Sequence, residues 1–190
     1  VGDLAGTEVA SLFHAPDGVL WAGTTRGLAR LLPGGALTRV EVTGLPEQSV
    51  TVIASGPRGG LLLGVTEAGL FEVDVSTLSA LRVGGDDVPG KNVSGLVRVA
   101  EGGGIWIATS DRGAFRWDGA SGFERFGMTE GLPDARVWAA FEDREGIVWF
   151  GTDSGLAKKG PAAFRTFGPE DGLPVAAPLY GIAETPDGTL

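Results

Sequence analysis

Two aromatic side chains occupy one position of a recurring motif, and they are the residues of this sequence best suited to contacting a ligand. Trp138 and Tyr180 each stand second in a short apolar stretch that begins with an aliphatic residue. The corresponding residues of the earlier copies are small: Ala10, Thr51 and Ser94. A ring that is apolar on its face and polar at one edge can stack on a sugar ring or on another flat apolar surface. The alternative is that both rings only fill space between neighbouring strands.

Other residues with catalytic potential are better explained by structure. His14 is the single histidine and has no nucleophile or orienting carboxylate beside it in the sequence, so we interpret it as a surface turn residue. Glu142, Asp143 and Glu145 share one turn, where a capped turn is favoured over an acid–base pair. No cysteine is present and no acidic spacing is typical of a calcium loop. We therefore predict no catalytic residue, no metal site and no cofactor.

The elements that position the aromatic pair belong to a repeat. The segment 145–156 (EGIVWFGTDSGL) has related copies at 17–28, 58–70 and 102–113, and a fifth copy begins at 186–190. Trp21, Leu62, Trp106 and Trp149 are equivalent, at steps of 41, 44 and 43 residues. A period of this size with strand–turn–strand content is typical of a β-propeller. The sequence therefore predicts an all-β protein, a propeller segment of four-stranded antiparallel blades with about four and a half repeats of ~42 residues.

Each repeat predicts four strands with turns between them. First strands are expected at 9–13, 50–54, 93–97, 137–141 and 179–183, and a Pro-, Asp- and Gly-rich turn follows most of them. Blade boundaries are predicted at 9–49, 50–92, 93–136 and 137–178, with the start of a fifth blade at 179–190. We treat residues 1–190 as one propeller segment that is part of a longer propeller.

Most motif residues that recur from repeat to repeat are predicted to be structural. Packing needs such residues in every blade, whereas a single ligand site does not. The tryptophans are expected between blades, and the glycines two residues later are expected to leave space beside the second strand. These structural residues are Trp21, Trp106, Trp149, Gly23, Gly64 and Gly151.

In an up-and-down blade, the second turns and the blade-to-blade crossovers lie at the same end of the sheet. This places Arg26 and Arg112, from two second turns, at the same end as Asp134 and Arg136, which precede Trp138. Variable loops at one end of a repeat scaffold commonly carry function. The predicted ligand-binding residues are Trp138, Tyr180, Arg136, Asp134, Arg26 and Arg112.

Bulk composition excludes several classes of partner. The chain has 190 residues, 33 of them glycine, and its 15 basic and 24 acidic residues give a net charge of −9. This acidity argues against a nucleic-acid partner. No run approaches the ~18 apolar residues of a membrane span, so no membrane insertion is predicted within this segment. Blades left open at the ends of the segment predict self-association.

The motif GIVWFGTDSGLA at 146–157, followed by FRTF at 164–167 and DGLP at 171–174, resembles the two-component regulator propeller repeat. The resemblance extends over the whole chain, although the second repeat lacks the Trp and the third lacks the Gly after it. It implies a sensor propeller of bacterial hybrid two-component or cyclic-dinucleotide signalling receptors, located in the periplasm or otherwise outside the cytoplasm. Oligosaccharides or other nutrients are the ligands it implies.

Three functional hypotheses stay open. The first is a non-catalytic, ligand-sensing segment of a receptor whose kinase or cyclase output would lie outside this segment. The second is a passive platform for protein interaction or assembly, which the same scaffold serves equally well. The third, which the residues favour least, is a propeller lyase or glycoside hydrolase, since no histidine or isolated carboxylate pair converges.

Overall fold

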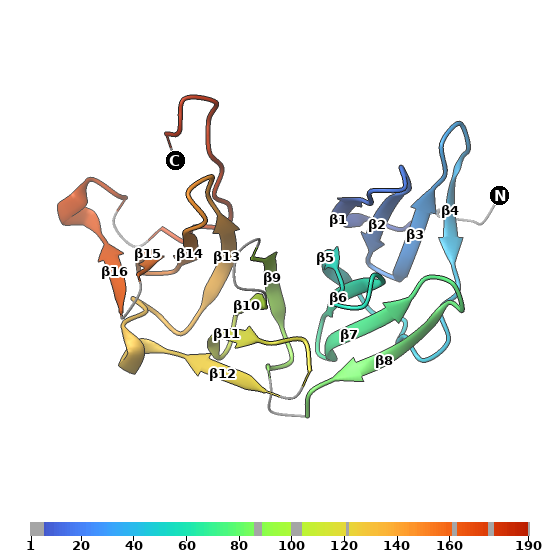
Figure 1. Cartoon of the computed structure of the whole chain (residues 1–190), viewed down its shortest axis with the longest axis horizontal. Helices are drawn as coiled ribbons and strands as arrows, with labels where there is room; N and C mark the ends of the chain where they lie inside the picture. The colour runs from blue at the N-terminus through green and yellow to red at the C-terminus, as the bar shows by residue number, and fades with distance from the viewer. Residues whose placement is uncertain are drawn as a thin grey trace. The chain divides into compact units, whose positions relative to one another are not determined.

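The computed structural model describes residues 6–85, 89–99, 104–120, 122–160, 163–174 and 177–189. The first two residues of the motif copy at 102–113 and the last residue of the chain, Leu190, lie outside these ranges. Contacts divide the chain into two compact units, Val1–Val93 and Ser94–Leu190. Four antiparallel four-stranded sheets make up the fold (Figure 1), which confirms the all-β propeller prediction.

Unit 1 contains two sheets whose strands pair in chain order (Figure 1). Blade 1 consists of β1 (Val9–His14), β2 (Leu20–Thr24), β3 (Gly27–Leu31) and β4 (Leu37–Val40). Blade 2 consists of β5 (Val50–Ser55), β6 (Leu61–Val65), β7 (Gly69–Asp74) and β8 (Ser79–Val83). The first strands β1 and β5 contact each other, so the two blades meet along their innermost strands.

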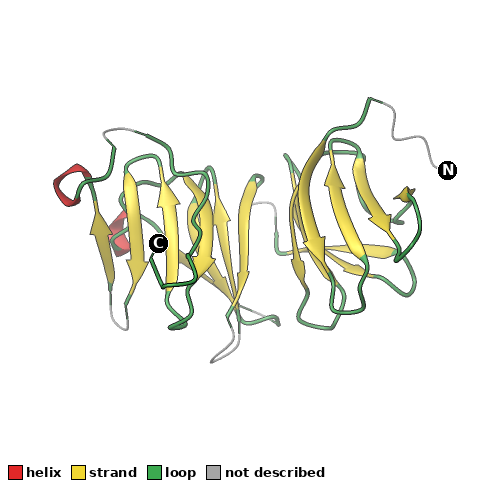
Figure 2. Cartoon of the chain, turned by 90° about the horizontal axis from the view of Figure 1, so that it is seen from above, coloured by secondary structure: helices red, strands yellow, loops and turns green. Residues whose placement is uncertain are grey.

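Unit 2 repeats this arrangement and then continues into a further segment. Blade 3 consists of β9 (Val93–Arg98), β10 (Ile105–Thr109), β11 (Gly113–Trp117) and β12 (Phe123–Phe126). Blade 4 consists of β13 (Val137–Glu142), β14 (Val148–Thr152), β15 (Gly155–Lys159) and β16 (Phe164–Phe167). The strands dominate the described chain, and its helices are two single 3₁₀ turns, Met128–Glu130 and Pro169–Asp171 (Figure 2). Among the described residues, no helix has the length and apolar character needed to cross a membrane.

Two of the three tryptophans predicted to lie between blades do so, Trp21 in unit 1 and Trp106 in unit 2. Trp21 of β2 belongs to an apolar cluster with Leu63 and Val65 of blade 2. Trp106 of β10 lies with its ring centroid 5.3 Å from that of Phe150, which belongs to blade 4. Trp149 is also buried, but the aromatic ring it contacts is Phe167 of its own blade, at 5.7 Å.

The predicted glycines permit close approach between neighbouring repeats. A Cβ atom on Gly64 would lie 2.7 Å from a methyl carbon of Val52 and 2.8 Å from the Cβ of Val93. A Cβ on Gly151 would lie 2.5 Å from the carbonyl oxygen of Leu179. These distances are too short for any side chain, so the glycine column is required by packing, as the sequence predicts.

One predicted strand is not formed. Residues 179–183 carry no strand assignment, although the turn after them has the expected hydrogen bonds, from Gly188 N to Thr185 O and from Thr185 N to Thr189 O. In each of the four blades the first strand pairs with the second strand, which follows this turn. Among the described residues, 179–183 pair with no other strand. The prediction of a first strand at 179–183 is therefore wrong for this structure.

Candidate functional site

A β-bulge determines the direction of the Trp138 side chain. In the pairing of β13 with β14, Val137 lies opposite Thr152 and Ala139 lies opposite Gly151, so Trp138 has no partner across the ladder. Bulges twist a strand locally and can redirect a side chain. β1 and β5 have the same irregularity, at Ala10 and Thr51. The second position of the first strand is therefore a bulge position in at least three of the four blades.

The indole of Trp138 makes one polar and one aromatic contact. Its Nε1 donates a hydrogen bond to Oδ1 of Asp153, at 2.5 Å. Its ring centroid lies 5.3 Å from that of Tyr180, with 59° between the ring planes. Trp138 is half-buried, whereas Tyr180 is 69% exposed. The two rings predicted to lie at equivalent points thus meet, and one of them presents most of its surface to solvent.

Charged groups of unit 2 extend this aromatic pair. Nε of Arg136 lies 2.7 Å from Oδ2 of Asp153, so Asp153 uses both of its oxygens, one for the indole and one for the guanidinium. The backbone N–H of Arg136 donates to Oδ1 of Asp134 at 2.9 Å, and the hydroxyl of Ser154 donates to the other Asp134 oxygen at 3.0 Å. We call this group the aromatic site; its members are Trp138, Tyr180, Asp134, Arg136, Asp153 and Ser154.

The same strand position has a structural role in blades 2 and 3, whereas in blade 1 the corresponding bond comes from the next residue, Ser11, whose hydroxyl donates to Val50 O at 3.0 Å. The hydroxyl of Thr51 donates to Val93 O at 2.7 Å, and that of Ser94 donates to Val137 O at 2.5 Å. Each of these hydrogen bonds, which we call junction hydrogen bonds, joins a first strand to a residue 42 or 43 positions later within the same compact unit, since Val93 is the last residue of unit 1. Trp138 makes no such bond; the junction after blade 4 uses a backbone bond from Leu179 N to Thr152 O, at 3.2 Å. In blade 4, as at Ala10 of blade 1, this position does not bond the next copy, and its side chain bonds Asp153 instead.

Four of the six predicted ligand-binding residues come together in the aromatic site: Trp138, Tyr180, Arg136 and Asp134. Arg112 lies in the second turn of blade 3, and its Nε is 3.9 Å from Oδ2 of Asp111. The next residue, Gly113, donates its backbone N–H to Ala135 O at 2.7 Å. The crossover 134–136 therefore passes beside the Arg112 turn.

Arg26 belongs to unit 1, where it lines a pocket of about 230 Å³ with Arg39, Leu45 and Glu47. Glu47 is bonded by Arg39 in this pocket, and that hydrogen bond, the Arg39 charge and the Arg26 charge hold the pKa of Glu47 below its ordinary value. The charge of Arg26 thus stabilises the ionised carboxylate of Glu47. The Arg39–Glu47 ion pair forms part of the lining of this pocket.

Asp153 and Ser154 were missed as site residues, although the sequence places both at the correct end of the blade. Their participation depends on the bulge at Trp138, which turns the indole toward the second turn of the same blade. The only sequence feature that could have indicated them is their position in the second turn of the blade, between β14 and β15. The bulge at Trp138 cannot be predicted from the residues of the turn that contains Asp153 and Ser154.

A larger pocket lies at the other end of blade 2. It has a volume of about 590 Å³ and is lined by the turns that contain Arg58 and Ser76, together with Glu72 and the exposed Leu81. Glu72 is a buried carboxylate, but Arg58 bonds both of its oxygens. The buried carboxylate of this lining is thus neutralised internally by Arg58, and the exposed Asp74 in the same lining accepts hydrogen bonds from Ser76.

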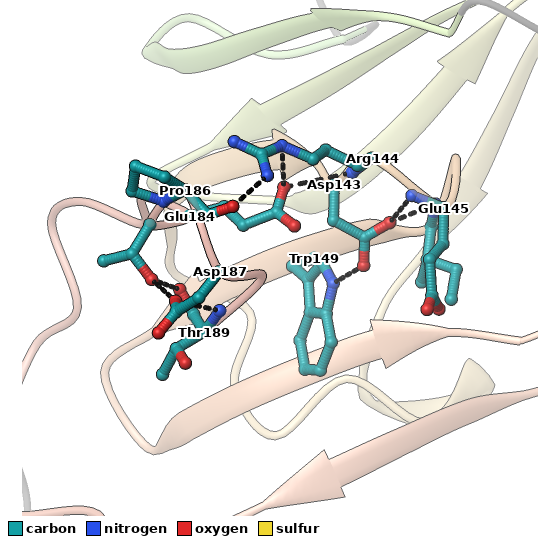
Figure 3. Close-up of polar contacts among 10 residues, drawn as sticks. Asp143, Arg144, Glu145, Trp149, Glu184, Pro186, Asp187 and Thr189 are labelled. Atoms are coloured by element: carbon teal, nitrogen blue, oxygen red, sulfur yellow. Dashed lines mark hydrogen bonds and ion pairs between the residues drawn. The ribbon is translucent and has the colours of Figure 1, made fainter.

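The residues examined for catalysis have structural surroundings. His14 is exposed at the end of β1. Asp143 caps its turn: Oδ1 accepts from the backbone N–H groups of Glu145 and Ile147, and Oδ2 accepts from Trp149 Nε1 at 2.7 Å (Figure 3). In the part of the chain that the structure describes, no group of three or more His, Cys, Asp or Glu side chains could hold a metal ion.

Comparison with known proteins supports the repeat assignment. Residues 131–154 match the family model described as "Two component regulator propeller", which confirms the resemblance predicted from the sequence over this stretch. The stretch contains five of the six residues of the aromatic site, all but Tyr180. No curated protein sequence matches the chain.

Solved structures share the fold at low sequence identity. The extracellular domain of BT3049 from B. thetaiotaomicron, which is classed as a hybrid two component system, superposes with a TM-score of 0.85 at 20% identity over 96% of this chain. The corresponding domain of BT4673 from the same organism gives 0.76 at 16% identity over 91% of this chain. The chain spans 26% and 22% of those two structures. A virginiamycin B lyase from Staphylococcus aureus gives 0.68 at 13% identity over 84% of this chain and 55% of the lyase.

Proposed function

We propose that this chain is a segment of a ligand-sensing propeller of a bacterial signal-transduction receptor, and that the aromatic site is where it contacts its ligand. The proposal includes a location outside the cytoplasm. It is supported by the match of residues 131–154 to the regulator propeller family and by the fold shared with the two extracellular domains from B. thetaiotaomicron.

The observation that carries the proposal is the substitution of the junction hydrogen bond by an aromatic pair. Thr51 and Ser94 bond the start of the next first strand, whereas Trp138 turns to Asp153 and lies beside the exposed ring of Tyr180. Tyr180 is 69% exposed in this chain, so its ring is accessible to a ligand. An exposed large aromatic beside a fixed polar network is typical of a binding surface.

The chemistry of the site indicates a ligand with a flat apolar face and several hydroxyl groups, such as an oligosaccharide. The tilted rings offer surfaces for stacking, and Asp134, Asp153 and Arg136 supply both acceptors and donors within one network. Because Trp138 and Asp153 are fixed by mutual hydrogen bonding, little side-chain entropy remains to be lost there on binding. We propose binding without catalysis in this segment.

Titration calorimetry with a panel of neutral and acidic oligosaccharides tests this function. Replacing Tyr180 by Ala removes the exposed stacking surface, and we expect affinity to fall by about tenfold, equivalent to ~1.4 kcal/mol. Tyr180→Phe is the matched control, since it retains the ring and should bind nearly as the wild type does. If no oligosaccharide binds, or if Tyr180→Ala binds as tightly as Tyr180→Phe, the aromatic site is not the ligand site.

Self-association is a second proposed interaction. In unit 1, blade 2 packs on blade 1 through the Trp21 cluster, while β1 exposes Val9 by 50% and Leu12 by 63%. Large exposed apolar side chains on a first strand, which in the other blades is the strand nearest its neighbours, favour contact with another blade. We propose that the isolated chain associates through such blade surfaces.

A further inference from the structure

The turn between β13 and β14 lacks the proline found in three of its four counterparts along the sequence. Three equivalent turns have proline at their second position: Pro16, Pro57 and Pro186. Residue 144 is instead Arg, which brings both a guanidinium and a backbone N–H that proline lacks. Proline is favoured at this position because it presets φ. The third repeat, with Ala100, also lacks it, so the role of Arg144 follows from its contacts.

Arg144 bonds the segment that follows blade 4. Its backbone N–H donates to Oε2 of Glu184 at 3.1 Å, and its Nη1 donates to the carbonyl oxygen of Pro186 at 2.7 Å (Figure 3). Its Nε lies 3.8 Å from the same Glu184 oxygen. The Glu184 side chain is only 10% exposed, so this carboxylate is enclosed at the contact and not a loose surface partner.

These contacts lie close in the chain to the exposed ring of the aromatic site. Tyr180 lies between Leu179, whose N–H bonds Thr152 O, and Glu184, which Arg144 holds. The described residues 177–189 contain no strand, so the segment lacks the ladder that fixes the other first strands. Its hydrogen bonds to blade 4 flank Tyr180, from Leu179 on one side and from Glu184 and Pro186 on the other.

We propose that Arg144 is a positioning residue for the aromatic site, holding Glu184 and Pro186 so that Tyr180 stays beside Trp138. The consequence for ligand affinity rests on the proposed function, whereas the positioning itself does not. The competing explanation is that Arg144 only stabilises its own turn. The proline found in the three related turns separates the two explanations, because Arg144→Pro keeps a residue suited to the turn and removes both contacts to the segment.

Tyr180 is the only tyrosine of the chain, so labelling with 3-fluorotyrosine gives a single fluorine resonance that reports on this ring. In the wild type we expect a resonance displaced from its position in unfolding concentrations of urea, because the Trp138 ring lies 5.3 Å away. Trp138→Leu gives the resonance of a folded protein without the indole. Arg144→Pro should shift the wild-type resonance most of the way toward the urea position while the circular dichroism spectrum stays folded.

An Arg144→Pro resonance at the wild-type position overturns the proposal, as does a wild-type resonance that already coincides with the urea position. Should Arg144→Pro fail to fold, Glu184→Ala removes the same contact from the exposed segment and is judged by the same criterion. The fluorine measurement needs no ligand. Absence of oligosaccharide binding would therefore overturn the proposed function but not the positioning role of Arg144. An unchanged resonance in Arg144→Pro would overturn the positioning role but not the proposed function.

Discussion

At the scale of single residues, Asp143 shows how one carboxylate organises a blade. Burial raises its pKa, but hydrogen bonds from Trp149, from the backbone of Ile147 and Glu145, and the charge of Lys158 act in the opposite direction and leave the pKa below its ordinary value of 3.8. Both oxygens are used, one for the turn and one for the indole. Asp143 therefore fixes the turn and the ring of Trp149 together.

Asp143→Asn tests this role. The asparagine amide has one acceptor oxygen, so its NH₂ group must face either the turn N–H groups or Trp149 Nε1, which are also donors. We therefore expect the free energy of unfolding at pH 7 to fall by ~1–3 kcal/mol. A pKa lowered in the folded state stabilises the protein above about pH 3.8, and this stabilisation is lost as pH falls through the folded value. The difference between wild type and Asp143→Asn in urea titrations should therefore shrink toward pH 3. The exposed Glu145→Gln is the control, with a change below ~0.5 kcal/mol.

At the scale of elements, neighbouring blades are joined by two recurring contacts. A glycine of the second strand admits the start of the next repeat, as at Gly64 and Gly151. A hydroxyl of the first strand donates to a carbonyl of the next first strand, as at Thr51 and Ser94. Both contacts depend on short side chains, so a large residue in either column marks a blade junction that is held differently.

Thr51→Val removes one junction hydrogen bond at nearly constant shape. Because the carbonyl of Val93 then loses a partner in a partly buried position, we expect a destabilisation of ~1–3 kcal/mol in chemical denaturation. Thr129→Val, at an exposed threonine of the first 3₁₀ turn, should change stability by less than ~0.5 kcal/mol. Equal effects of the two substitutions would show that the junction hydrogen bond of Thr51 does not stabilise the fold.

The elements could be predicted from the sequence because their signals are local. The first strands of the four blades and the glycine column follow from the repeat, and the fourth strands of blades 3 and 4 follow from paired phenylalanines, such as Phe164 and Phe167. The residues of the aromatic site could be predicted only in part. The bond from Trp138 to Asp153 requires a bulge, and the bond from Arg144 to Glu184 joins residues 40 positions apart.

At the scale of the whole molecule, the chain consists of two compact units, each containing a pair of blades. Each pair buries aromatic and aliphatic side chains between its sheets, around Trp21 in unit 1 and around Trp106 in unit 2. Outside these interfaces, unit 1 exposes Val9 and Leu12 of β1. A chain with a net charge of −9 repels its copies, so association requires such apolar contact.

Static light scattering of the purified chain tests this association. We expect a mass above that of a monomer that rises with concentration and is retained in 0.5 M salt, roughly the range where charge repulsion is screened within a few ångströms. Leu12→Lys places a charge on the exposed face of β1 and should lower the mass toward the monomer, whereas Thr129→Lys should leave it unchanged. A strictly monomeric wild type at high concentration would contradict self-association.

The recurrence of a bulge at the second position of the first strand has an evolutionary consequence. Because Ala10, Thr51 and Trp138 are all unpaired in their ladders, this position accepts residues of very different size without a change of strand register. Duplicated repeats can therefore diverge here independently, each forgoing one hydrogen bond of about 0.5–1.5 kcal/mol when it acquires a ring. New binding specificities can arise blade by blade on an inherited scaffold.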